Sequence, residues 1–179
     1  MPMEKLTLRA MEPEDLEVLY KIENDRTLWD VGVTNVPYSR YVLHDFISNS
    51  TGNIYADGQV RLMIELEGQV IGIVDLVNFD AKNRKAEISI VLEKAYRGHG
   101  YAYETLLQLT DYARRTLHLH QLYVVIGADN TPAIQLFKKL GYHESVHLPD
   151  WLYDGENYHP AIVMHSLLPS ATLAASPAR

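Results

Sequence analysis

The stretch Arg97-Gly98-His99-Gly100-Tyr101-Ala102 decides the fold, because it joins an alternating apolar strand to an amphipathic helix. Small residues in such a loop let the backbone approach a ligand closely, and the amides of the loop and of the first helical turn converge on one spot. The helix dipole and the Arg97 guanidinium both favour an anion there, and pyrophosphate suits the spot. The alternative is that Gly98 and Gly100 only form a tight turn.

Two well-known phosphate-binding motifs do not fit this loop. Its glycine spacing differs from the dinucleotide fingerprint, and the strands before it form hairpins rather than parallel βαβ units. A Walker loop needs Gly-Lys followed by Ser or Thr, which the segment lacks.

Upstream of the loop, hydrophobic periodicity predicts one strand, two helices and three further strands. The expected segments are a strand at 6–10, a helix from 12 to about 23, a helix at 40–47 capped by Ser39, a hairpin of strands at 60–66 and 69–79, and a strand at 86–92. On the last strand, alternation places Ala86, Ile88, Ile90 and Leu92 on one face and Lys85, Glu87, Ser89 and Val91 on the other.

Downstream, the pattern predicts a helix, a strand, a second helix and two closing strands. The expected segments are a helix from 101 to 117, a strand at 121–126 that is buried on both faces, a helix at 131–140 ended by Gly141, and strands at 142–147 and 158–167. This order predicts a mixed α/β (α+β) layer. We expect one domain at 1–168, and a disordered or artificially added tail at 169–179, which is rich in Ala, Ser and Pro.

Composition excludes several classes of function. The chain has 179 residues and no cysteine, so it has no disulfide, thiolate zinc site, iron–sulfur cluster or cysteine nucleophile. A formal net charge of -7 argues against nucleic acid and is compatible with a cationic substrate. No apolar run approaches transmembrane length and the start lacks the pattern of a secretory signal, so we expect a cytoplasmic protein with no membrane partner.

Two segments resemble the cofactor motifs of the GCN5-related N-acetyltransferase (GNAT) family. Arg97-x-x-Gly100-x-Ala102 is similar to that family's acyl-CoA pyrophosphate loop, and 130–142, Asn-Thr-Pro-Ala-Ile-Gln-Leu-Phe-Lys-Lys-Leu-Gly-Tyr, is similar to its second motif. The resemblance covers 6–168 and is greatest to the spermidine (polyamine) and ribosomal-protein N-terminal acetyltransferases. It implies acetyl-CoA as co-substrate, a mostly antiparallel sheet split by a V-shaped gap, helices on both faces, and a homodimer.

The resemblance also implies which residues bind acetyl-CoA. The strand at 88–92 would splay from the strand at 122–126, the pantetheine arm would lie in that gap, and the loop amides would hold the pyrophosphate. The implied cofactor-binding residues are Ile90, Val91, Leu92, Arg97, Gly98, His99, Gly100, Tyr101, Ala102, Asn130, Ala133 and Phe137. For Asn130, a turn residue before a helix is the alternative.

The reaction needs a proton acceptor. An alkyl amine with a pKa near 10.4 is only about 0.04% neutral at pH 7, so its deprotonation costs about 4.6 kcal/mol. Glu87 is the candidate base, since it lies on the polar face of the strand and the polyamine branch places an acid there; a solvated strand residue is the alternative. Asp75, Asn78 and Tyr38 are the candidate substrate-binding residues, although Asp75 and Asn78 could equally be exposed hairpin residues.

The leaving group poses a separate question. Related enzymes place a tyrosine hydroxyl near the CoA sulfur, and this chain has Phe137 at that position. A thiol pKa near 8.5 means that leaving as thiolate costs only about 2 kcal/mol at pH 7, so the change slows turnover without abolishing it. Water, Tyr101 or Tyr142 could substitute, although packing is the commoner role of such aromatic residues.

Three functional hypotheses follow. The first is an N-acetyltransferase in which a primary amine, of a polyamine or of a protein or peptide, attacks directly in a ternary complex. The segment 34–40 lacks the acids of the polyamine branch, which weakens the case for spermidine. The others are a non-catalytic acyl-CoA-binding sensor and an α/β scaffold with a structural turn. We predict no metal, and surface or strand-edge roles for the histidines His118, His120, His147, His159 and His165.

Overall fold

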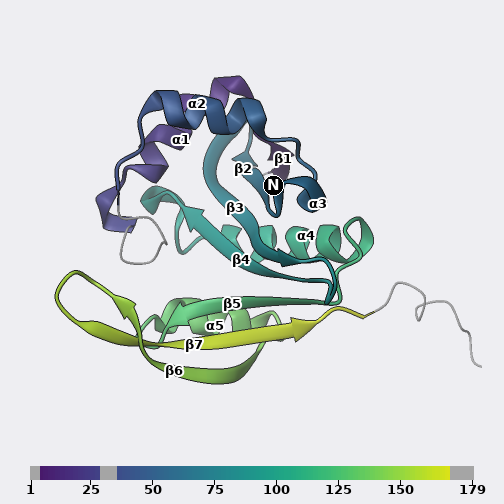
Figure 1. Ribbon diagram of the computed structural model, residues 1–179, viewed down its shortest axis with the longest axis vertical. Helices are drawn as coiled ribbons and strands as arrows, with labels where there is room; N and C mark the ends of the chain where they lie inside the picture. The colour runs from purple at the N-terminus through teal and green to yellow at the C-terminus, as the bar shows by residue number, and fades with distance from the viewer. Residues whose placement is uncertain (1–4, 29–35, 170–179) are drawn as a thin grey trace, which may run out of the picture.

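A single seven-stranded sheet, in the order β1-β2-β3-β4-β5-β7-β6, forms the centre of the protein (Figure 1). The computed structural model describes residues 5–28 and 36–169. The strands are β1 (Leu6–Ala10), β2 (Val60–Leu66), β3 (Gln69–Asp80), β4 (Lys85–Leu92), β5 (Gln121–Gly127), β6 (His143–Tyr153) and β7 (Tyr158–Leu167). Neighbouring strands are antiparallel except β4 and β5, which are parallel. The predicted mixed, mostly antiparallel sheet is confirmed.

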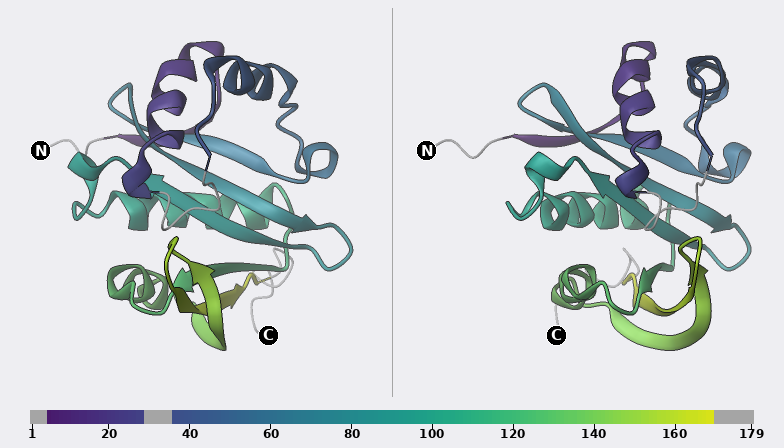
Figure 2. Two further views of the ribbon diagram at one scale, coloured as in Figure 1. Left: turned by 60° about the vertical axis from the view of Figure 1, so that its left-hand side comes forward. Right: turned by 90° about the vertical axis from the view of Figure 1, so that its left-hand side faces the viewer.

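Helices cover both faces of the sheet, as predicted. They are α1 (Leu16–Glu23), α2 (Arg40–Asn49), α3 (Ile54–Asp57), α4 (Tyr101–Arg115) and α5 (Thr131–Lys139), with short 3-10 turns η1 (Pro13–Asp15), η2 (Arg26–Leu28) and η3 (Lys94–Tyr96). Figure 2 shows α1 and α2 on one face of β1 to β4 and α4 on the other. The predicted cap of α2 is present, since the Ser39 side chain accepts a hydrogen bond of 3.2 Å from Val42 N.

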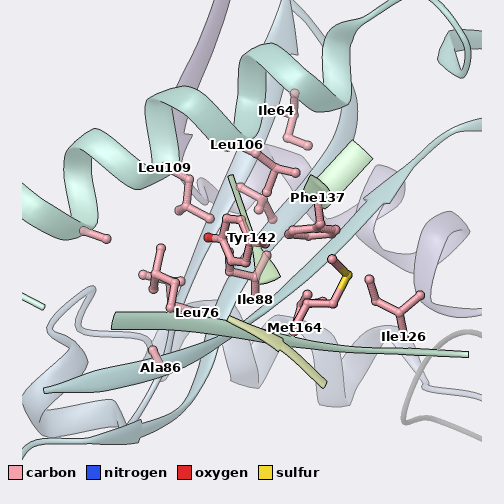
Figure 3. Close-up of a cluster of buried hydrophobic side chains, with 14 of the residues drawn as sticks. Ile64, Leu76, Ala86, Ile88, Leu106, Leu109, Ile126, Phe137, Tyr142 and Met164 are labelled. Atoms are coloured by element: carbon pink, nitrogen blue, oxygen red, sulfur yellow. The ribbon is translucent and has the colours of Figure 1, made fainter. Parts of the chain in front are cut away.

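Two apolar clusters hold these layers together. The larger cluster lies between the sheet and α4 and α5, where Ile88 of β4 meets Leu106 of α4 and Phe137 of α5 (Figure 3). The smaller cluster lies under α1 and α2 and consists of Leu19, Ile22, Leu43, Met63 and Ile73. Burying each such side chain contributes roughly 1.5–3 kcal/mol, so both faces of β3 and β4 are fixed by packing.

The sheet splits between its two central strands. β4 and β5 pair only at Lys85–Gln121, Ala86–Leu122 and Glu87–Tyr123. Beyond this point the two strands diverge toward their carboxyl ends (Figure 1), which confirms the predicted V-shaped gap. Because α4 follows β4 and α5 follows β5, the first turns of both helices lie at the open end of the gap. Glu87 and Tyr123 mark its closed end.

Several sequence-based expectations need correction. β5 is buried on one face only, since Leu122, Val124 and Ile126 are buried but the residues between them are half-buried. The reason is that α4 and α5 cover one face of β5, whereas the helices on the other side, α1 and α2, lie over β1 to β4 (Figure 2). The helix α3 was not expected, and β6 runs to Tyr153 rather than ending near 147. The expected tail falls almost entirely in 170–179, outside the described residues.

Candidate active site

The edge of β4 that faces the gap presents backbone groups. Glu93 N donates a hydrogen bond of 2.9 Å to Ile71 O of the β3 side, so the odd-numbered residues of β4 turn their backbone toward β3. The backbone groups of Ile90 and Leu92 therefore face the gap. Val91 turns its backbone groups toward β3, and its side chain packs under α1 and α2. Its backbone therefore does not face the gap, unlike the backbone of Ile90 and Leu92. The edge from Glu87 to Leu92 spans about 16 Å of extended chain.

The loop between β4 and α4 has the geometry of an anion cradle. Gly98 and Gly100 have φ values of +79° and +90°, which L side chains rarely adopt, and no heavy atom lies within 4 Å of a Cβ placed at either residue. The first hydrogen bond of α4 is donated by Glu104 N to Gly100 O, so the amides of the preceding helical residues belong to the exposed start of the helix. The residues present therefore fit a phosphate group.

Side chains in this loop mostly support its shape. Arg97 Nε donates a hydrogen bond of 2.9 Å to Leu92 O, which ties the loop to the end of β4. His99 is exposed and stacks on Tyr101, with ring centroids 5.9 Å apart. Tyr101 and Ala102 pack partly against the larger apolar cluster. Contacts from these side chains to a cofactor remain a prediction.

Asn130 caps the second helix at the open end of the gap. Its side chain accepts a hydrogen bond of 3.3 Å from Ala133 N, and Pro132 lies in the first turn of α5. The Asn130 side-chain oxygen therefore caps the helix, as expected for a turn residue that precedes a helix. A second role for its amide group, toward the pantetheine arm, remains a prediction, as does cofactor contact by Ala133.

Phe137 is buried, with 2% of its surface exposed, and contacts Tyr142 edge-on with ring centroids 5.0 Å apart. Figure 3 shows the Tyr142 hydroxyl on the side of Leu109, away from Phe137. Burial raises the pKa of Tyr142 to about 12. A buried phenol that holds its proton so tightly is a poor general acid, so the structure favours packing as the role of Tyr142.

At the closed end of the gap, Glu87 belongs to a polar group of side chains. Asn78 Nδ2 donates a hydrogen bond of 2.8 Å to Glu87 Oε2. Asn78 reaches it from a bulge in β3, where its own φ is +50°. Tyr123, the β5 partner of Glu87 in the register, has a pKa raised first by burial and then by the Glu87 charge and hydrogen bonding. The structure therefore brings two predicted site residues together, with a tyrosine that the sequence did not single out.

Asp75 lies one row farther along the same face and is not an exposed hairpin residue. It is buried, with 6% exposed, and binds Arg61 through two hydrogen bonds of 2.7 and 2.8 Å. Arg61 also pairs with Glu23 of α1. Burial lowers the pKa of Arg61, but these two carboxylates outweigh it and raise the pKa overall. The exposed-residue alternative for Asp75 is therefore wrong, because an internal guanidinium holds its carboxylate.

Tyr38 packs against the smaller apolar cluster, and its backbone is held at the end of α1. Its N–H donates to Asn24 Oδ1 at 2.8 Å, and its carbonyl accepts from Asn24 Nδ2 at 3.0 Å. Residues 34 and 35 of the preceding segment fall outside the described residues.

A hollow of about 430 Å³ opens beside Arg61, lined by Val42, Asp45, Phe46, Asn49, Ser50, Asp57, Gln59 and Arg61. It lies between α2, α3 and the start of β2 rather than at Glu87. Within the part of the chain that the structure describes, no three His, Asp or Glu side chains form a group that could hold a metal ion.

Tyr123, Arg61, Glu23 and His165 are polar residues of this face that sequence reasoning missed or set aside. His165 of β7 is the register partner of Tyr123, as Tyr123 is of Glu87. Alternation along β5 separates Tyr123 from the buried Leu122 and Val124, so the sequence could predict that Tyr123 lies on the other face of the sheet. The sequence could not predict the partner of Tyr123 on the neighbouring strand, because that partner depends on the register.

Comparisons with known proteins agree with this geometry. A family model described as an acetyltransferase (GNAT) domain matches residues 5–143. A spermidine N(1)-acetyltransferase of Escherichia coli is 28% identical over 158 residues, which cover 88% of this chain and 83% of that protein. The structure of a Vibrio cholerae spermidine N-acetyltransferase in complex with CoA and spermine has a TM-score of 0.81 at 27% identity, covering 91% of this chain and 95% of that chain. A dodecameric structure of the Vibrio cholerae enzyme, 26% identical with a TM-score of 0.79, covers 91% and 94%.

Proposed function

This chain belongs to the acetyltransferase (GNAT) family and is an acetyl-CoA-dependent N-acetyltransferase, and we propose that its acceptor is a polyamine such as spermidine, deprotonated by Glu87. The observation that carries the proposal is the position of Glu87. Its carboxylate lies at the closed end of the split between β4 and β5, held by Asn78 at 2.8 Å. A carboxylate fixed there can take a proton from an amine that approaches from the face of α1 and α2.

Acetyl-CoA supplies the activated acetyl group. We propose that the amides of residues 97–102 hold its pyrophosphate, that the gap-facing backbone of Ile90 and Leu92 pairs with the pantetheine arm, and that Asn130 contacts the arm. Glu87 accepts the ammonium proton, directly or through a water, so that the neutral amine attacks without an acyl-enzyme. The zero cysteine count is consistent with direct attack.

Local charge supports a cationic acceptor. The face that carries Glu87 holds more carboxylates than cations among the described residues: Glu23 and Asp75 share Arg61, Asp15 and Glu65 share Arg9, and Glu87 lies on the same side of β4 as Lys85. This excess of negative charge adds to a formal net charge of -7 and favours a polycation. A protein or peptide amino group is the second candidate, favoured by the lack of acids over 34–40. Asn78 and Tyr38 are proposed to line the acceptor path.

Three wider expectations belong to the same proposal. Residues 1–168 are proposed to form one acetyltransferase domain, and the chain is proposed to be cytoplasmic. It is also proposed to self-associate, at least as a homodimer; the Vibrio cholerae relative forms a dodecamer. No described helix is both long and apolar enough to cross a membrane. Sedimentation of the purified chain measures the oligomer directly.

Binding and turnover test the proposal in two steps. Isothermal titration with acetyl-CoA is expected to show binding at submillimolar ligand, and Gly100→Arg is expected to abolish it by filling the loop. Thiol release is then measured with spermidine, small diamines, basic peptides, and neutral and anionic amines at moderate salt. Spermidine is expected to be the best acceptor. Binding without release for any amine would instead support an acyl-CoA sensor.

Glu87→Gln tests the proposed base. The amide keeps the shape and a hydrogen bond but cannot accept the proton, so we expect kcat to fall by roughly 10²-fold or more, with acetyl-CoA affinity unchanged. Glu67→Gln, at the β2–β3 turn, is the matched control and is expected to keep the wild-type rate. An unchanged rate in Glu87→Gln would remove Glu87 from the reaction.

A further inference from the structure

A row of polar side chains crosses the sheet at the closed end of the gap. Glu87 of β4 is the register partner of Tyr123 of β5, Tyr123 is the partner of His165 of β7, and His165 is the partner of His143 of β6. Directly paired residues of neighbouring strands place their side chains on the same face. This face is the one opposite α4 and α5, since Leu122 and Met164, the residues adjacent to Tyr123 and His165 in sequence, are buried in the cluster beneath those helices.

Contacts are present at the two ends of the row. Asn78 Nδ2 donates a hydrogen bond of 2.8 Å to Glu87 Oε2, and the pKa of Tyr123, the register partner of Glu87, is raised first by burial and then by the negative charge of Glu87. At the far end, Ser145 Oγ hydrogen-bonds to His165 Nδ1. Ser145 is exposed whereas Tyr123 and His165 are half-buried, so the row leads from the closed end of the gap to solvent.

We propose that Tyr123 and His165 form a proton relay that carries the acceptor's proton from Glu87 to solvent. The inference rests on the proposed function, in which Glu87 is the base, and adds the path by which that base is regenerated. Strands lie about 4.8 Å apart, so His165 lies about 9.6 Å of backbone away from Glu87, a span that one tyrosine hydroxyl between them can bridge.

Protons balance along the row. The ammonium group loses one proton to the Glu87 carboxylate. As Glu87 gives that proton to the Tyr123 oxygen, the Tyr123 hydroxyl passes its own proton to the neutral imidazole of His165, so that the tyrosine is unchanged. The resulting imidazolium releases the proton to water, and Glu87 is again a carboxylate. Imidazole suits the last position, because its ordinary pKa of about 6.5 lets it gain and lose a proton near neutral pH.

The groups that face His165 define its electrostatic surroundings. They are Tyr123 on β5, His143 and Ser145 on β6, and, beyond Tyr123, Glu87. The charge of Asp80 also acts on Tyr123.

Kinetics at low buffer concentration test the relay. We expect Tyr123→Phe and His165→Ala each to lower kcat by about tenfold, with KM for the amine and acetyl-CoA affinity unchanged. Adding imidazole buffer is expected to restore the rate of His165→Ala, because a small base can replace the missing side chain, but not that of Tyr123→Phe. His159→Asn, on the same strand but outside the row, is the control and is expected to behave as wild type.

The outcomes of these measurements distinguish the relay from the proposed base. If Glu87→Gln loses activity but Tyr123→Phe and His165→Ala keep the wild-type rate at low buffer, the relay is refuted and the base stands. If His165→Ala is slow and imidazole does not restore it, the residue is structural and the relay is also refuted. An active Glu87→Gln refutes the proposed function itself.

Discussion

Replacing Gly72 by alanine tests whether β4 is held where the site needs it. Gly72 lies in β3 opposite Leu92, the last residue of the gap-facing edge. A Cβ at this position would lie 2.3 Å from Val91 O, 2.8 Å from Leu92 Cδ2 and 3.1 Å from Leu92 Cα. Since ordinary C···O contacts lie at about 3.3 Å, the β4 backbone has to move by about 1 Å.

That movement is opposed from both sides of β4. Leu92 is buried under α4 in the larger cluster, and Val91 packs under α1 and α2 in the smaller one. Overpacking of a well-packed interior costs about 1–3 kcal/mol, and we expect the upper end because the clash is with backbone. For a chain of this size, about 3 kcal/mol lowers Tm by about 6–12 °C.

Thermal unfolding measures the loss, and titration with acetyl-CoA measures its effect on the site. Gly72→Ala is expected to bind acetyl-CoA more weakly, because the displaced strand carries Ile90 and Leu92. Gly68→Ala is the matched control: its φ of +84° strains alanine, but no heavy atom lies within 4 Å of the added Cβ. Its Tm is expected to fall less and its acetyl-CoA affinity to persist. If Gly72→Ala loses no more stability than Gly68→Ala, the packing argument is wrong.

Three further substitutions separate structural from functional roles. Burial raises the pKa of Asp15, but hydrogen bonds from Arg9 and the Glu12 backbone outweigh this effect and lower the pKa below 3.8. The ionised carboxylate therefore stabilises the folded state above that pH. Asp15→Asn is expected to lower Tm at pH 7, and the difference in Tm from wild type is expected to shrink in melts taken below about pH 3.8. Tyr142→Phe is expected to keep or raise Tm with kcat unchanged, because its buried hydroxyl makes no hydrogen bond within the described residues; a fall in kcat would make this tyrosine an acid. Asn130→Asp keeps the cap of α5 but removes the amide N–H group. Titration with acetyl-CoA should then show weaker binding, whereas Tm should not change. Unchanged binding would mean that Asn130 acts only as a helix cap.

Local sequence predicted most of the elements, α3 and the full length of β6 excepted, because each depends on neighbours along the chain. Alternation over 85–92 placed Glu87 and Leu92 on opposite faces, and Ser39 was identified as a cap from its place before an apolar helical repeat. Both predictions follow from backbone periodicity. The burial of Asp75 could not be predicted in this way, because it depends on its ion pair with Arg61 of β2, which also binds Glu23 of α1. These residues come together only in the folded sheet.

The proposed relay lies beyond local reasoning for the same reason, and its dependence on register is strict. A hairpin turn sets the register of β2 with β3, but β4 and β5 are joined through α4, so no turn fixes which residue of β5 faces Glu87. Packing fixes it instead: Leu122 and Val124 have to face α4 and α5, which turns Tyr123 to the other face. A slip of one residue would bury the tyrosine hydroxyl and expose two apolar side chains, so the core that closes the gap also aligns Tyr123 between Glu87 and His165.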